Sequence, residues 1–160
     1  MATFREITDR LVRILTDERA TLMDGLDPEL CEIRAQLPNP LFNRYAMFVH
    51  MSAQDDIQYG SMTGTGTAWV GEIDGVGTWR LTCAVNVPMD DEEAAADCER
   101  MADNLLTVLP GYRQEETDPV WGAMLVSRIG GIDTYQTETT GQVVNGIGID
   151  LRIRWSREQT

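Results

Sequence analysis

Two segments of the chain alternate large apolar residues with polar or small ones, and this alternation constrains the fold more than any other feature. In residues 78–87 the apolar positions are Trp79, Leu81, Cys83, Val85 and Val87. In residues 147–156 they are Ile147, Ile149, Leu151, Ile153 and Trp155. Because successive side chains of a strand point to opposite faces, this pattern predicts two half-buried strands. The chain therefore needs a sheet with one face in a hydrophobic core and the other face polar.

Two amphipathic helices are predicted to cover that sheet face. Thr3 and Glu6 form a capping box, which satisfies free amides of a first helical turn. The apolar residues that follow at steps of three and four are Phe4, Ile7, Leu11, Ile14 and Leu15. A second helix is predicted from Asp90, with Glu93 as its N3 carboxylate, to the residue before Pro110. The face that we expect it to pack on the sheet is Ala94, Cys98, Met101, Leu105 and Val108.

The rest of the chain is predicted to be short elements separated by turns. Apolar runs indicate further strands at residues 44–51, 67–73 and 120–129. Asp74-Gly75 is typical of a hairpin turn, since both residues tolerate positive φ. Gly130-Gly131 is expected to end the third of these strands, and Asp27-Pro28 to begin a short helix over residues 28–35.

Two polar segments are expected to project from the sheet, residues 54–66 as a long loop or an extended hairpin end and residues 131–141 as a loop. Both are rich in glycine and threonine, and loops of about 12 residues without secondary structure are usually functional or disordered. The expected element order is then α-β-β-β-α-β-β in one domain of residues 1–160. This order predicts an α+β fold, with the N-terminal helix and one central helix packed on one face of a mainly antiparallel sheet.

The charge of the chain is strongly negative. There are 26 acidic residues against 13 basic ones, a net charge of -13, and every basic residue is arginine. This field disfavours nucleic-acid binding, because affinity for nucleic acid depends on cations that neutralise phosphates. A dense carboxylate surface without lysine resembles proteins of salt-loving organisms, in which salt screens the repulsion. GC-rich coding bias is the other interpretation of the missing lysine.

Membrane insertion and secretion are not indicated. No stretch approaches the about 18 uninterrupted apolar residues that a membrane helix needs. The first residues also lack the basic-then-apolar layout of a signal peptide. We therefore expect no membrane partner and no secretion by that route.

The sequence contains no recognisable catalytic or metal-binding motif. The only histidine, His50, ends an apolar strand and has no Ser or Cys motif around it. Cys31, Cys83 and Cys98 include no CxxC pair, so small buried thiols are the expected role. The acidic run of residues 90–93 is explained by helix capping rather than by a cation site. We expect no enzyme activity, no catalytic residue, no metal and no cofactor.

The order of elements resembles the tail terminator, or tail-completion, proteins of long-tailed phages and haloarchaeal tailed viruses. The closest part is residues 79–109, in which a strand leads through PMDDEEA into a helix that ends in LPGY. The late strand also carries alternating arginines, Arg152 and Arg154, as the last strand of that family does. The long segment 54–66 and the unusual acidity depart from the family pattern.

The resemblance implies a structural virion protein that is made in the host cytoplasm. Its subunits would form a ring, commonly a hexamer, at the head-proximal end of the tail tube, where the ring ends tube growth. The implied partners are further copies of the chain, the tail tube protein and a head-completion or connector protein, with the genome passing through without specific binding. Another head-tail connector or stopper of the neck is one alternative. A small ligand-binding or enzymatic α+β domain is the other.

We expect the two projecting segments and the last strand to form the interface. The candidates in the first segment are Gln54, Asp55, Asp56 and Tyr59. Those in the second segment and the last strand are Tyr135, Thr137, Arg152 and Arg154. Tyrosine suits this role because it offers apolar area together with a hydroxyl group.

Overall fold

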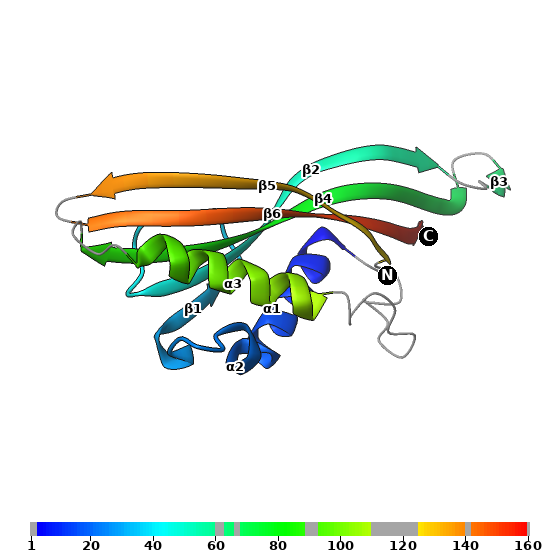
Figure 1. The fold of residues 1–160 in the computed structure, drawn as a ribbon. Helices are drawn as coiled ribbons and strands as arrows, with labels where there is room; N and C mark the ends of the chain where they lie inside the picture. The colour runs from blue at the N-terminus through cyan, green and yellow to red at the C-terminus, as the bar shows by residue number, and fades with distance from the viewer. Residues whose placement is uncertain are drawn as a thin grey trace.

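The computed structural model describes residues 3–59, 63–65, 68–88, 93–109, 125–139 and 142–159. A long sheet forms one layer, and the helices lie together on one of its faces (Figure 1). The helices are α1 (Phe4–Asp17), α2 (Arg19–Leu22), the 3-10 helix η1 (Pro28–Leu30) and α3 (Ala94–Val108). The strands are β1 (Cys31–Arg34), β2 (Tyr45–Tyr59), β3 (Thr63–Thr65), β4 (Ala68–Pro88), β5 (Leu125–Thr139) and β6 (Gln142–Gln159). The predicted α+β class is confirmed.

The strands lie in the order β1-β2-β4-β6-β5, and the short β3 pairs with β4 beside this path. β1 runs parallel to β2, and all other paired strands are antiparallel. β4 and β6 pair continuously from Gly71 with Gln159 to Pro88 with Gln142. These two strands form the centre of the sheet and contain both of the alternating segments.

Helix α1 begins with the predicted capping box. The Glu6 amide donates a hydrogen bond to the Thr3 hydroxyl at 3.1 Å, and the Thr3 amide donates one to the Glu6 carboxylate at 3.0 Å. Two amides that the first turn leaves without a helical partner are thereby satisfied. The apolar stripe is buried in the core: Ile7, Leu11, Ile14 and Leu15.

Helix α3 buries its predicted face but begins later than expected. Its fully buried residues include Ala94, Cys98, Met101 and Leu105, and Val108 packs against the same core. The helix begins after Glu93, whose side chain makes no capping hydrogen bond, so the predicted start at Asp90 is wrong. Negative charge near a helix N-terminus is favourable over a whole turn, so the acidic run does not select one starting residue. Asp90 itself lies outside the described residues.

Trp79 and Trp155 are the largest side chains in the core between the helices and the sheet. The Trp79 indole N–H donates a hydrogen bond to the Thr8 hydroxyl on α1 at 3.0 Å, so its single polar atom is paired. Phe4 stands edge-on to both tryptophans, with centroid distances of 6.2 Å and 5.1 Å. The start of α1 is thereby anchored to the two central strands.

The expected hairpin turn at Asp74-Gly75 lies instead inside β4, and the two strands predicted on either side of it are one strand. Gly75 pairs with Trp155 of β6. A Cβ atom on Gly75 would overlap the Trp155 indole. This glycine therefore makes room for a tryptophan in the core rather than for a turn.

The loop expected at residues 131–141 is a strand wherever the structure describes it, and residues 54–59 follow the second alternative, an extended arm of a hairpin. β2 continues to Tyr59, paired with β4, and β5 continues through Gly130-Gly131 to Thr139, paired with β6. β4 and β6 satisfy the backbone amides and carbonyls that face them, and threonine suits an extended backbone. The expected break at Gly130-Gly131 is a bulge, since the register shifts there. The other residues of the two segments lie outside the described ranges.

The expected short helix at residues 28–35 is one 3-10 turn followed by β1. The Asp27 carboxylate caps this turn by accepting a hydrogen bond from the Glu29 amide at 3.0 Å. Cys31 then pairs with Tyr45 of β2 and is buried, so sheet pairing ends the helical turn. The strand expected at residues 120–129 is described from Leu125 onwards.

Candidate interaction surface

The sheet face opposite α1 and α3, which we call the outer face, carries charged and polar side chains. Residues of β4 and β6 that alternate with the core positions project onto it, because side chains of a strand point to the two faces in turn. Arg80 of β4 and Asp150 of β6 are directly paired there, with 2.8 Å between Nε and Oδ1. The Arg80 side chain also covers Gly148, which leaves space for it on the neighbouring strand.

Arg152 reaches from β6 across β4 to Asp55 on β2, with 2.6 Å between Nη1 and Oδ2. The same nitrogen lies 3.5 Å from the Thr78 hydroxyl of β4. Both charged side chains are partly exposed, and such pairs contribute about 0–1 kcal/mol to stability. The contact therefore positions side chains more than it stabilises the fold. It brings together Asp55 and Arg152, two of the residues that the sequence singles out.

Gln54 is a structural residue of the core face and not the start of a projecting loop. Its side-chain oxygen accepts a hydrogen bond from the Trp155 indole N–H at 2.7 Å. Its amide end lies over Gly77, where any Cβ atom would collide with it. Gln54 therefore reaches from β2 over the two central strands, and its place in an interface stays a prediction.

The remaining candidates do not gather in one place. Arg154 is exposed beyond Arg152 on the outer face. Thr137 is exposed on β5, and at the ordinary rise of a strand it lies about 30 Å along β5 from Arg128, the partner of Arg152. The backbones of three candidates lie in β2 and β5, and their side chains lie outside the described residues: Asp56, Tyr59 and Tyr135.

His50 lies on the outer face, in register with Arg80. Burial lowers the pKa of His50 below its usual value, and the positive charge of Arg80 lowers it further. Its Nδ1 atom is buried and has no hydrogen-bond partner among the described residues. These observations describe an imidazole that packs into the outer face beside Arg80 and whose charged form is disfavoured there.

The three cysteines are buried free thiols. Burial raises the pKa of Cys31 to about 11 and that of Cys98 to about 12, and it raises the pKa of Cys83 as well. The Cys98 thiol donates a hydrogen bond to the Cys83 carbonyl oxygen at 3.2 Å. A thiol that stays protonated is a poor nucleophile and a poor metal ligand. All three therefore serve packing.

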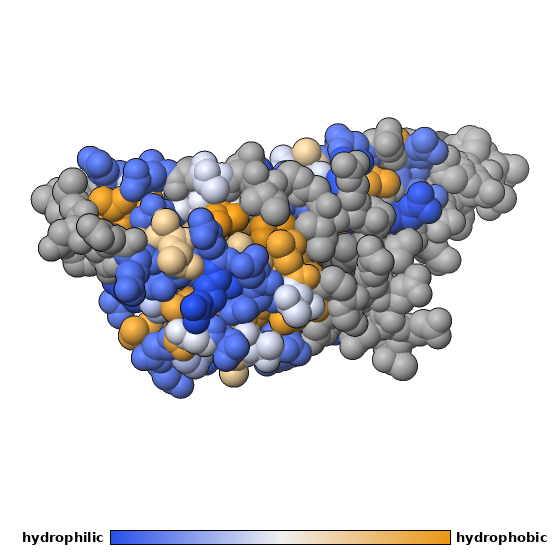
Figure 2. All heavy atoms as spheres, in the orientation of Figure 1, coloured by the Kyte–Doolittle hydropathy of each residue, from blue (hydrophilic) through white to orange (hydrophobic). Residues whose placement is uncertain are grey.

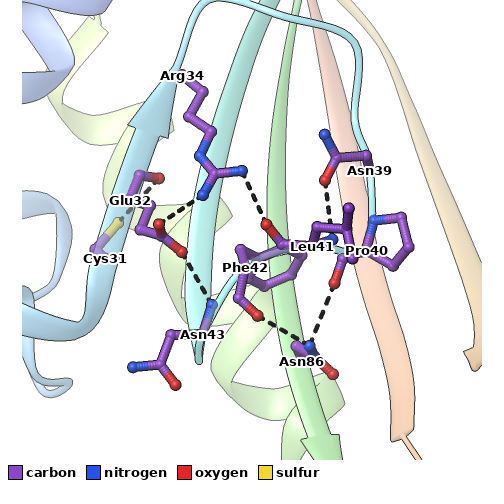
Figure 3. Close-up of polar contacts among 9 residues, drawn as sticks. All are labelled: Cys31, Glu32, Arg34, Asn39, Pro40, Leu41, Phe42, Asn43 and Asn86. Carbon is purple, nitrogen blue, oxygen red and sulfur yellow. Dashed lines mark hydrogen bonds and ion pairs between the residues drawn. The ribbon is translucent and has the colours of Figure 1, made fainter. Parts of the chain in front are cut away.

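The connection between β1 and β2 is a feature of the outer face that the sequence did not predict. This segment, residues 35–44, which we call the strap, joins two parallel strands and folds over the sheet (Figure 3). Beneath it lies a second apolar cluster, separate from the main core: Phe42, Ala46, Phe48, Ala84 and Val144. Phe42 and Phe48 meet edge-on with ring centroids 5.8 Å apart. The outer face is thus partly buried by the chain itself.

Polar contacts at both of its sides hold the strap (Figure 3). On β1, Glu32 accepts hydrogen bonds from Arg34 at 2.6 Å and from the Asn43 amide at 2.9 Å. Arg34 in turn donates to the Leu41 carbonyl at 2.9 Å. The Asn43 amide, and then the Arg34 side chain, lower the pKa of Glu32 below its usual value. On β4, the Asn86 side chain donates to the Phe42 carbonyl at 3.1 Å.

The strap also exposes two large apolar side chains, Leu37 (67%) and Leu41 (79%). Beside it lies a cavity of about 80 Å³ lined by Pro38, Asn39, Pro40, Thr137 and Val144. Thr137 is therefore a neighbour of the strap. The prolines and leucines of the strap are visible in the sequence, but only the parallel pairing of β1 and β2 shows that the segment crosses a sheet.

An open groove lies on the helical side of the molecule, between described residues of α2 and α3. In its described part this side is mostly hydrophilic, with small separate apolar patches (Figure 2). The groove lies between α2 and α3 and has a volume of about 460 Å³. Its lining residues are Ala20, Thr21, Asp24, Asn104, Thr107 and Val108. Asp24 is the single ionisable group among them, so the lining holds no acid–base pair.

The described residues show neither a metal site nor a membrane-spanning helix, and the sequence has no match among known families. Within the described ranges, no three His, Cys, Asp or Glu side chains are grouped so that they could hold a metal ion. None of the helices described is long and apolar enough to cross a membrane. No protein-family model matches the sequence, and no curated protein matches it.

Proposed function

We propose that the protein is a tail terminator, which forms a ring on the head-proximal end of a viral tail tube and joins the tail to head-completion proteins. The observation that carries this proposal is the one-sided sheet. All the described helices cover one face, while the long strands β4 and β6 present a polar, ion-paired outer face. Together with the resemblance in element order, this arrangement fits a subunit whose sheet faces a channel and whose helices face outwards.

The charges of the outer face suit a channel through which DNA moves without being held. Arg80 is paired with Asp150, and Arg152 is paired with Asp55, so the guanidinium groups already have carboxylate partners. Binding of a duplex draws on cations that are free to neutralise phosphates. The chain as a whole carries a charge of -13, which opposes retention of DNA further. The ring would thus act in the virion as a structural conduit and not as an enzyme.

The test is the size and shape of the particle that the purified protein forms. Light scattering and negative-stain microscopy in about 2 M KCl, where charge repulsion is screened, should show a ring with a central hole. Added to assembling tail tubes, the ring should cap one end and limit their length. A monomer that binds a small molecule in the groove between α2 and α3 would overturn the proposal. Rings that bind a portal or connector but never a tube would indicate another neck protein.

A further inference from the structure

The large apolar side chains that the described structure exposes are gathered in one part of the chain. All of them lie within residues 30–57: Leu30, Leu37, Leu41, Met51 and Ile57. The two most exposed are Leu37 (67%) and Leu41 (79%), and both belong to the strap. A single exposed leucine is common on a protein surface, whereas several apolar side chains on one segment indicate an interaction surface.

The same part of the chain is free of acidic residues. Residues 33–54 form the longest stretch of the sequence without Asp or Glu, in a chain that contains 26 of them. The two arginines of this stretch are paired, Arg34 with Glu32 at 2.6 Å and Arg44 with Asp97 at 3.7 Å. Residues 35–43, between these arginines, include no ionisable side chain. The strap therefore presents its leucines without adding a charge of either sign.

The backbone that carries the leucines is held in place before any partner binds. The Asn39 side chain accepts a hydrogen bond from the Leu41 amide at 2.9 Å, and the Leu41 carbonyl accepts one from Arg34 at 2.9 Å (Figure 3). Phe42, the next residue, is buried in the apolar cluster of the outer face. Two prolines fix further φ angles of the strap. Binding through the leucines thus orders little backbone, which lowers the entropic cost of association.

The charge of the chain indicates which kind of partner needs such a surface. A partner with a basic surface would be attracted to the carboxylates elsewhere on the chain. A second copy of this chain also carries a charge of -13, so two copies repel one another wherever their carboxylates meet. Contact between copies is therefore least opposed at residues 33–54, where one of the two sides contributes no carboxylate.

We propose that the strap, through Leu37 and Leu41, packs against a second copy of this chain. This contact deepens the proposed ring and rests on it for its closure, because in a closed ring each strap meets a different surface of the next subunit. The cavity of about 80 Å³ beside the strap, lined in part by Pro38 and Pro40, offers space for a side chain of the neighbour. Apolar burial holds the copies together, and molar salt strengthens the contact by screening the remaining carboxylates.

Substitution of both leucines tests the contact. Leu37→Glu/Leu41→Glu places two carboxylates on the strap, and Ala95→Glu/Ala96→Glu places the same two charges at exposed positions of α3. Size-exclusion chromatography with light scattering in about 2 M KCl should show wild type and the α3 variant as the same oligomer. The strap variant should be monomeric or should need at least about tenfold more protein to assemble, because like charges at an interface oppose it.

A second strap variant separates lost apolar contact from added charge. Leu37→Ser/Leu41→Ser removes apolar area without a new carboxylate and should also weaken assembly. Circular dichroism of dilute, monomeric protein checks folding. Both strap variants should melt as the wild-type monomer does, since substitutions of exposed side chains change stability little. The serine variant decides the test if the glutamate variant does not fold.

Photo-cross-linking identifies the partner. Leu37→Cys labelled with a benzophenone maleimide places a reactive group on the strap, and the native cysteines are buried and should stay unlabelled. Irradiation should join two copies of the chain and give a product of twice its 17.9 kDa. Ala96→Cys with the same label, at an exposed position of α3, is the control and should give far less of this product.

The outcomes separate this inference from the proposed function. A ring that both strap variants dissociate, and that the α3 variant retains, supports both. A ring that persists in the strap variants, or that the α3 variant dissociates equally, would overturn the strap contact and leave the ring proposal intact. A dimer that the strap variants dissociate would support the contact and overturn the terminator. A wild-type protein that stays monomeric in molar salt would overturn both.

Discussion

The two faces of the sheet are stabilised in different ways. The core face buries Trp79, Trp155 and the neighbouring aliphatic side chains under α1 and α3. The outer face has no helix in the described structure, and it combines ion pairs with a small apolar cluster under the strap. The first face is an ordinary hydrophobic core, whereas the second is covered only in part by the described chain.

Met101→Asp should unfold the protein. Met101 is fully buried between α3 and the sheet, and an unpaired carboxylate there costs several kcal/mol, a large part of the about 5–15 kcal/mol that stabilises a domain. Circular dichroism and thermal melts would measure the loss of folded structure. Ala96→Asp, exposed on the same helix, is the control and should stay folded. A cooperative melt of Met101→Asp near the wild-type temperature would show that α3 packs through another face.

Phe48→Ala should destabilise the protein by about 3–5 kcal/mol, the usual cost of deleting a buried phenylalanine. Phe48 is completely buried on the outer face, against Phe42 of the strap. Urea denaturation would give the change in the free energy of unfolding. Leu41→Ala removes an exposed strap side chain and should change that free energy by less than about 0.5 kcal/mol. Equal effects of the two substitutions would mean that the strap does not cover Phe48 in solution.

Glu32→Gln should make the protein less stable at neutral pH and less sensitive to acid. The folded pKa of Glu32 is lowered by the Asn43 amide and by Arg34. Ionised Glu32 therefore adds to the free energy of unfolding at pH values above its pKa in the unfolded chain. This stabilisation is lost as the pH falls through the pKa of Glu32 in the folded protein. Because the Glu32 carboxylate is partly exposed, we expect Glu32→Gln to lower the free energy of unfolding by about 1 kcal/mol at pH 7.

Denaturation curves for wild type and Glu32→Gln should converge at acid pH, below both pKa values of Glu32. Glu29→Gln, which removes an exposed carboxylate from η1, is the control and should follow the wild-type pH profile. A difference between wild type and Glu32→Gln that is constant with pH would rule out the ionised Glu32 as the source of the effect.

The Asp55–Arg152 pair should contribute the least to the stability of the protein, with a coupling energy below about 1 kcal/mol. A double-mutant cycle with Asp55→Asn and Arg152→Gln would measure it, because the cycle removes the separate effects of each substitution. Molar salt should reduce the coupling further. A coupling of several kcal/mol would mean that the pair is buried in solution, for example by a neighbouring subunit.

Sequence patterns identified the elements whose signal is local. The capping box at Thr3 and the apolar face around Met101 needed only a few neighbouring residues, and both are confirmed. The turn at Asp74-Gly75 failed for the opposite reason. That dipeptide favours a hairpin by local conformation, yet Trp155, far away in the chain, needs the space beside Gly75.

The candidate site was predicted only in part. Asp55 and Arg152 were both named from the sequence, but their contact at 2.6 Å depends on the register of three strands. Gln54 was assigned to a loop because its neighbours are polar, although it pairs with the Trp155 indole. The strap gave no clear signal, since short connections between parallel strands look like ordinary loops in a sequence.

By itself, the sequence determined the class of fold, the two long core strands and the helix faces that cover them. It did so because the period of the apolar residues indicates directly which side chains are buried on folding. The tertiary structure decided how far each strand extends, where the strap crosses and which edges stay open. Those features depend on pairing between residues such as Gly75 and Trp155 or Asp55 and Arg152, far apart in the chain. No local pattern encodes such pairs, because their free energy exists only once the strands are side by side.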